Sequence, residues 1–115
     1  LREYQKAVKR LEEAINQQKN DFIRDSVIQR FEFCVELAWK TAKRVMGSAT
    51  AAPKDIVREM AQSGYVTKAD LWLKAIDMRN LSSHTYKEIL ADQVYDFACH
   101  FIDEFKVLAT KFENK

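Results

Sequence analysis

The chain has 115 residues, of which 47% are hydrophobic and 31% charged, and its formal net charge is +2. This length predicts one domain over residues 1–115, and the composition is sufficient for a hydrophobic core. The small net charge excludes a strong basic field that would hold a long nucleic acid by electrostatics alone. No segment approaches the roughly 20 apolar residues of a membrane span, so no membrane partner is expected.

The numbers of glycine, proline and cysteine residues further limit the possible fold classes and the kinds of site. Two glycines and one proline leave few turn signals, which favours long helices over an all-β fold. Cys34 and Cys99 fall among apolar helical positions without metal-ligand spacing. We therefore expect reduced, buried cysteines in a cytoplasmic protein, with no metal site and no cofactor. No signal peptide is visible, although the chain begins at Leu1.

Helical periodicity begins close to the N-terminus. The first predicted helix covers about residues 2–18, where apolar residues recur at three- and four-residue spacing. The second covers about residues 22–46 and ends at Gly47, a usual C-terminal capping residue. This helix has more apolar residues than one stripe needs, so it is either central in a bundle or exposes a ridge to a partner. Phe33 and Leu37 are the candidates for such a ridge and hence for a dimer interface.

Three further helices complete the pattern. The third should begin at Pro53, whose missing N–H costs nothing in a first turn. The fourth should follow a capping box formed by Thr67 and Asp70, and should fray near residues 82–83, because serines compete for backbone hydrogen bonds. The last covers about residues 90–112. Together they predict an all-α fold, a single up-and-down bundle of about five helices that resembles a four-helix bundle.

The segment from Arg79 to Tyr86 contains the candidate catalytic and phosphate-binding residues. Imidazole titrates near neutral pH, while guanidinium stays charged and offers forked donors to phosphate oxygens. Arg79 and His84 could therefore cleave RNA without a metal, or bind a nucleotide phosphate. Asn80 could orient either side chain or a phosphate. The hydroxyl of Tyr86 could be modified by another enzyme.

Other interpretations of these residues stay open. On a straight helix Arg79 and His84 lie about 140° apart after a full turn, so they would approach only if the helix ended near the serines. Both could instead cap the helix C-terminus, where cations are favoured. Tyr86 could be a loop residue that packs on the bundle.

Charged residues outside this segment have simpler interpretations. Glu32, Glu36 and Lys40 lie one helical turn apart, so they form ion pairs on a solvated face or line a cleft. His100 is expected at the surface. Trp39 and Trp72 are expected in the core or an interface.

Two blocks of the sequence resemble the HEPN superfamily (higher eukaryotes and prokaryotes nucleotide-binding domains). The first runs from Arg79-Asn80 to His84 and continues through Thr85 to Tyr86. The second, residues 30–40 (RFEFCVELAWK), is similar to the nucleotidyltransferase substrate-binding protein family of the same superfamily. The longer form of the first block is similar to the toxins of HEPN–minimal nucleotidyltransferase toxin–antitoxin pairs.

This resemblance implies a homodimer in which two Arg/His motifs face each other and cleave RNA without a metal. His84 would be the general acid or base, Arg79 would hold the scissile phosphate, and Asn80 would assist. It further implies a minimal nucleotidyltransferase partner that transfers AMP from ATP to Tyr86 and so blocks the site. The alternative is a non-catalytic subunit that binds the substrate or nucleotide of a two-chain nucleotidyltransferase.

Overall fold

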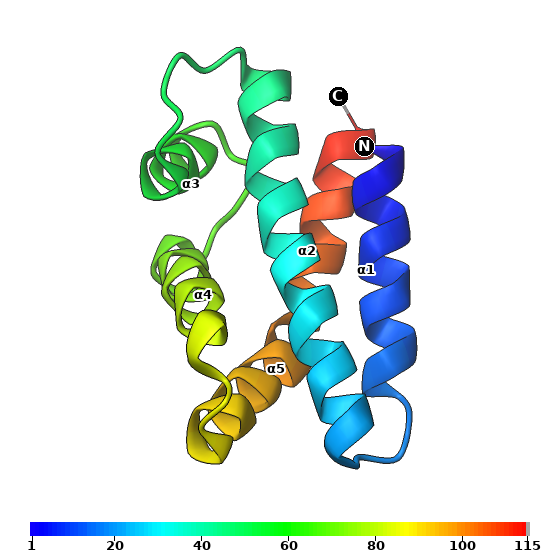
Figure 1. Cartoon of the computed structure of the whole chain (residues 1–115). Helices are drawn as coiled ribbons and strands as arrows, with labels where there is room; N and C mark the ends of the chain where they lie inside the picture. The colour runs from blue at the N-terminus through cyan, green and yellow to red at the C-terminus, as the bar shows by residue number, and fades with distance from the viewer. Residues whose placement is uncertain (115) are drawn as a thin grey trace.

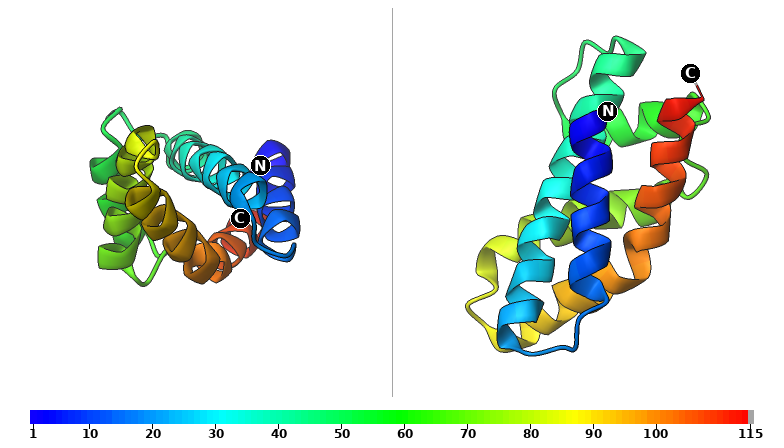
Figure 2. Two further views of the ribbon diagram at one scale, coloured as in Figure 1. Left: turned by 60° about the horizontal axis from the view of Figure 1, so that its bottom comes forward. Right: turned by 90° about the vertical axis from the view of Figure 1, so that its right-hand side faces the viewer.

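Every regular element of the described chain, residues 1–114, is helical in the computed structural model (Figure 1). In chain order the elements are α1 (Arg2–Ile15), α2 (Asp21–Met46), α3 (Pro53–Gln62), α4 (Ala69–Leu81), the 3₁₀ turn η1 (Ser82–His84) and α5 (Glu88–Glu113). α1, α2 and the second half of α5 run alongside one another, while α3 and α4 cover one side of α2 (Figures 1 and 2). The predicted all-α helical bundle is confirmed.

The local sequence explains the ends of α2 and the start of α3. The Asn20 side chain accepts a hydrogen bond from the backbone N–H of Ile23 at 2.8 Å, which satisfies a free donor of the first turn. Gly47 follows the last turn with φ of 63°, a left-handed conformation that a residue without Cβ adopts at little cost. Pro53 is the first residue of α3, as the sequence predicts.

Two local expectations are wrong. α1 ends at Ile15 rather than near residue 18, because the polar residues that follow offer no apolar side chain to bury. The capping box of Thr67 and Asp70 does not form. Lys68 takes the N-cap position of α4 and no side-chain hydrogen bond caps this end, so Thr67 lies outside the helix.

Aromatic side chains join α5 to three other helices. The buried Tyr4 hydroxyl of α1 donates a hydrogen bond to the backbone oxygen of Phe105 at 2.7 Å. Phe31 of α2 lies edge-on to Phe105 with ring centroids 6.0 Å apart. Trp72 of α4 packs edge-on against Phe101 at 4.8 Å, which confirms its predicted place in the core. These contacts fix the position of α4, which carries Arg79.

The two cysteines differ in environment. Cys34 is fully buried in the core, and this burial raises the pKa of its thiol from 9.0 to about 12. Cys99 is only half-buried, which corrects the expectation that both are buried. Both are free thiols.

The molecule measures 39 × 23 × 20 Å, and the N-terminus and the end of α5 lie at the same end of the bundle (Figure 2). No helix within residues 1–114 combines the length and the apolar character needed to cross a membrane.

Candidate functional site

Arg79 lies in the last turn of α4 and extends towards α2. Its Nε donates a hydrogen bond to Glu36 Oε1 at 3.0 Å, and its Nη1 lies 3.7 Å from Glu32 Oε2. Glu36 also lies 3.6 Å from Lys40 Nζ, one turn further along α2. Glu36 therefore forms the predicted ion pair along the helix, and Glu32 and Glu36 together hold the guanidinium of Arg79.

Ser82 connects the end of α4 to the same part of α2. Its buried hydroxyl lies 2.5 Å from Glu32 Oε2 and 2.5 Å from the backbone oxygen of Arg79. The Ser83 hydroxyl donates to the backbone oxygen of Asn80 at 3.0 Å. These back-bonding serines account for the predicted change at this point, where α4 gives way to η1. No local pattern points to Ser82 as part of the site, because its partner Glu32 lies 50 residues away in the chain.

His84 closes η1 and is exposed to solvent. Its ring lies edge-on to the ring of Tyr86, with centroids 6.1 Å apart. The Tyr86 side chain is 77% exposed, so it does not pack on the bundle as one interpretation suggested. The backbone N–H of Lys87 donates to the His84 oxygen at 3.2 Å, which closes the turn that carries both rings.

The structure brings the predicted residues together in two groups. Arg79 joins Glu32 and Glu36, whereas His84 joins Tyr86. Within residues 1–114, no hydrogen bond or ring contact links Arg79 to His84. Arg79 lies in the last turn of α4, where a cation is favoured, and its Nε bonds Glu36 of α2 rather than a carbonyl oxygen of its own helix. Asn80, the next residue in the chain after Arg79, is exposed.

A polar hollow of about 340 Å³ lies beside Glu32, between α2 and the turn that follows α4. Asp25, Gln29 and Glu32 line it from α2, and Ser82 and Thr85 line it from the turn. Among the residues that the structure describes, no group of three or more His, Cys, Asp or Glu side chains is arranged to hold a metal ion. The hollow offers mainly hydrogen-bonding oxygens, and Arg79 lies at the edge formed by Glu32.

The family model "Nucleotidyltransferase substrate binding protein like" matches residues 1–114. The chain belongs to this family. The resemblance found in the sequence blocks is thereby confirmed, and the substrate-binding-protein family to which the second block pointed is the one whose model matches almost the whole chain.

Two relatives extend the comparison. This chain is 32% identical over 96 residues to the probable ribonuclease HepT of Haemophilus influenzae. That match covers 76% of this chain and 66%, just under two thirds, of the relative. The chain is also similar to a Thermus thermophilus protein of known crystal structure. This likeness has a TM-score of 0.85 at 28% identity, and covers 94% of this chain and 97% of the other.

Proposed function

We propose that this protein is a ribonuclease that works with a nucleotidyltransferase partner, and that its site is formed by Arg79, Asn80 and His84. The observation that carries the proposal is the placement of Arg79 by two glutamates, close in the chain to an exposed histidine. The family description and the name of the Haemophilus influenzae relative support the same assignment.

The proposed chemistry needs no group beyond these side chains and the RNA. One His84 imidazole removes the proton of a ribose 2′-hydroxyl, and the oxygen attacks the adjacent phosphorus. The bond from phosphorus to the 5′-oxygen breaks, and a protonated imidazole supplies a proton to that leaving oxygen. The products are a 2′,3′-cyclic phosphate and a 5′-hydroxyl. Arg79 stabilises the charge that develops on the phosphate oxygens.

The need for both a base and an acid favours a site built from two copies of the chain, because each copy has one His84. Glu32 and Glu36 offset the positive charge of one Arg79, so a phosphate would meet little net attraction in a single copy. A guanidinium has five N–H donors, and only Nε–H is hydrogen-bonded within residues 1–114. Two facing copies would supply two guanidinium groups with free donors, together with one imidazole as base and one as acid.

Tyr86 is the proposed point of control. Its hydroxyl is exposed, and its ring lies beside that of His84. Transfer of AMP from ATP to this hydroxyl forms a bond between the tyrosine oxygen and the α-phosphorus and releases pyrophosphate. The added phosphate charge would then occupy the space that the RNA phosphate needs.

The test of the ribonuclease is cleavage of total RNA and tRNA by purified protein in the presence of a chelator. We expect wild type to cleave, and His84→Ala and Arg79→Ala to lose at least about 100-fold in rate, the scale of a lost general base or charge stabiliser. Arg58→Ala is the matched control, because Arg58 is exposed and pairs with Asp55 on α3. Cleavage that persists in both site variants would refute this site.

The test of control is mass spectrometry after incubation with the partner nucleotidyltransferase and ATP. Wild type should gain the mass of AMP, and Tyr86→Phe should not. An equal gain in Tyr86→Phe would place the acceptor on another residue.

A second candidate function is a non-catalytic subunit that binds the substrate or nucleotide of the nucleotidyltransferase. The pairing of Arg79 with two carboxylates favours it, since a partly neutralised guanidinium suits orientation better than phosphate capture. The same RNA assay decides between the two. A folded wild type that cleaves nothing, yet is required for transfer by the partner, would establish the binding subunit.

A further inference from the structure

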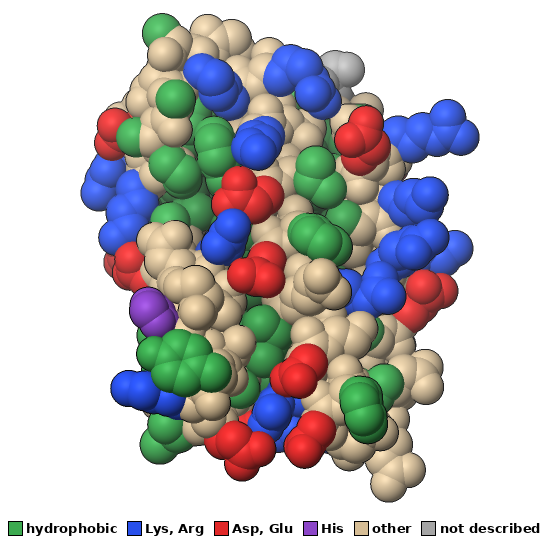
Figure 3. All heavy atoms as spheres, in the orientation of Figure 1, with side chains coloured by type: hydrophobic (Ala, Val, Ile, Leu, Met, Phe, Trp, Pro, Cys, Tyr) green, Lys and Arg blue, Asp and Glu red, His purple; other side chains and the backbone are tan. Residues whose placement is uncertain are grey.

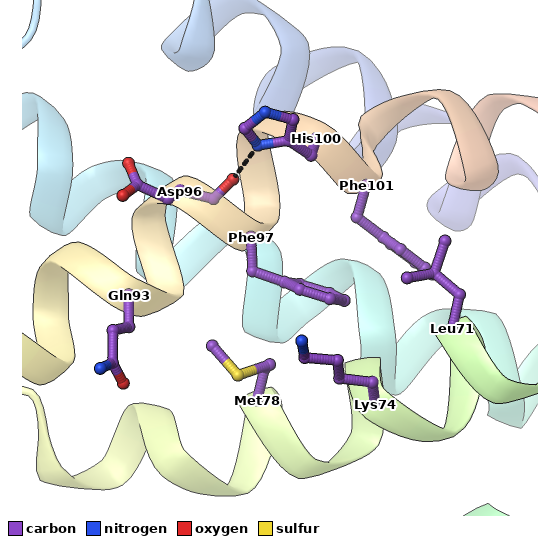
Figure 4. Close-up of a pocket in the computed structure, with 8 residues that line it drawn as sticks. All are labelled: Leu71, Lys74, Met78, Gln93, Asp96, Phe97, His100 and Phe101. Carbon is purple, nitrogen blue, oxygen red and sulfur yellow. Dashed lines mark hydrogen bonds between the residues drawn. The ribbon is translucent and has the colours of Figure 1, made fainter.

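A second hollow, of about 470 Å³, lies between α4 and α5 (Figure 4). α4 contributes Leu71, Lys74 and Met78, and α5 contributes Phe97 and Phe101 to the opposite wall. The volume falls within the range of small-molecule sites, and such sites typically combine an apolar wall with a few polar groups. Neither the RNA site nor Tyr86 uses any of these residues.

The α5 wall is a fixed aromatic surface. Phe97 stacks on Phe101 with centroids 5.2 Å apart and an angle of 20° between the rings. Phe31 holds the Phe97 ring from α2 at 5.8 Å, and Trp72 holds Phe101 at 4.8 Å. Phe97 is only partly buried, so the core fixes a ring whose remaining surface faces the hollow. A flat ligand ring could stack on Phe97 once the flexible Lys74 side chain, whose Nζ lies over this ring, swings aside to meet the ligand.

Lys74 places a positive charge at this aromatic wall. Its Nζ lies 5.9 Å from the centroid of Phe97, and Figure 4 shows the side chain reaching from α4 towards that ring. Within residues 1–114, Lys74 has no ion-pair partner. The carboxylate of Asp96 points away from Phe97 and Lys74 (Figure 4). Asp96 also lines the hollow, so an anionic group would bind at the Lys74 side of the hollow, away from this carboxylate.

Gln93 and His100 provide hydrogen-bonding groups at the rim. The Nδ1 atom of His100 lies 2.7 Å from the backbone oxygen of Asp96, so this nitrogen carries the proton and the ring is held in place. Gln93 extends towards α4 and presents both a donor and an acceptor (Figure 4). Mixed donors and acceptors suit the nitrogen-rich edge of a heteroaromatic ring better than a plain hydrocarbon ring.

We propose that the α4–α5 hollow binds a planar heteroaromatic ligand with an anionic group, of the size and chemistry of a nucleoside monophosphate. The ring stacks on Phe97, and the anion pairs with Lys74. This site lies on the α5 side of α4, whereas Arg79 extends from α4 to α2. The proposal does not depend on ribonuclease activity, so either can fail while the other stands.

The experiment is calorimetric titration of the full chain with AMP and GMP at low salt. We expect both to bind. Adenosine and ribose 5-phosphate, which lack the anion and the ring respectively, should each bind about tenfold more weakly than AMP. Lys74→Met should weaken AMP binding about tenfold, since a charge-assisted contact is lost. Lys111→Met, the same change at an exposed lysine near the end of α5, should leave it within about twofold.

Phe97→Leu tests the stacking surface and should weaken AMP binding to a similar extent. Should this partly buried substitution prevent folding, Lys74→Met alone decides, since Lys74 is exposed. Binding in Arg79→Ala should equal that of wild type. The proposal is refuted if wild type binds neither nucleotide, if Lys74→Met binds as wild type does, or if Arg79→Ala abolishes binding.

Discussion

At the scale of single residues, the glutamates that hold Arg79 set both its direction and its charge. Glu36 accepts a hydrogen bond from Nε, and Glu32 lies near Nη1 and also contacts Ser82. A guanidinium held in this way loses little freedom when it meets a substrate. The same carboxylates weaken its attraction for phosphate. Orientation and affinity therefore oppose each other at this residue.

Glu36→Gln should separate these two effects. The amide cannot carry the charge, so under the proposed ribonuclease function we expect RNA to bind about threefold more tightly. The rate at saturating RNA should fall by about tenfold, because Arg79 is less firmly oriented. Glu13→Gln, the same change at an exposed α1 residue, should alter neither quantity. Rate and affinity can be measured on one defined RNA by single-turnover cleavage. A fall in affinity in Glu36→Gln would contradict the electrostatic argument.

Because the Cys34 thiol is buried, we expect the folded protein to lose stability as the pH rises above about 9. Burial raises its pKa to about 12, so the folded protein keeps the proton while the unfolded chain releases it above about pH 9.0. Rising pH therefore favours the unfolded chain, and the free energy of unfolding should fall by about 1 kcal/mol between pH 9 and pH 10. Cys34→Ala, although less stable at pH 8, should lack this part of the fall.

Urea unfolding at pH 8, 9 and 10 checks this expectation. The buried hydroxyl of Tyr4, whose pKa is raised above its ordinary 10.0, contributes mainly at higher pH. Cys99 is present in both proteins, so its raised pKa cancels in the comparison. Equal pH dependence in wild type and Cys34→Ala would show that the thiol does not govern this range.

At the scale of elements, α2 is the helix on which the site depends. Its type and extent follow from periodicity and from Gly47, both of which are local signals, and the prediction of residues 22–46 differs from the structure by one residue at the start. Its contacts with α4 and η1 are not local. Glu36 and Arg79 are 43 residues apart, and no spacing rule pairs them. The helices and the segment from Arg79 to Tyr86 could therefore be predicted from the sequence. The identity of the carboxylates that hold Arg79 could not, because it depends on how α4 packs against α2.

The C-terminal cap of α2 at Gly47 can be tested by substitution. Gly47 has φ of 63°, and a Cβ built there would meet no atom within 4 Å. Gly47→Ala should therefore destabilise the protein through backbone strain alone, by about 1 kcal/mol. Gly47→Asn should cost less, because asparagine tolerates the left-handed region. Urea midpoints of the three proteins measure this. A greater cost for asparagine than for alanine would point to a steric rather than a conformational cause.

At the scale of the whole molecule, the outer surface of α1 and α2 combines an apolar ridge with basic residues. The Phe33 side chain is 53% exposed, and with Leu37 it borders a hollow of about 280 Å³. Lys6, Arg10 and Arg30 surround this hollow, with Glu3 as the acidic member. Lys and Arg side chains gather along the edge of the molecule over α1 (Figure 3). The proposed dimer would bury Phe33 and Leu37, and a two-fold axis would bring these basic residues towards their own copies.

Two consequences test this interface. Phe33→Glu should shift a dimer towards monomers by at least about tenfold in dissociation constant, because the buried ridge would gain a charge. Phe22→Glu, at a residue that is 86% exposed in the first turn of α2, should leave the dimer intact. Wild-type association should also strengthen between about 50 and 500 mM salt, since screening weakens repulsion between like charges. Sedimentation velocity measures both effects. A monomeric wild type, or a dimer that salt dissociates, would move the interface away from this ridge.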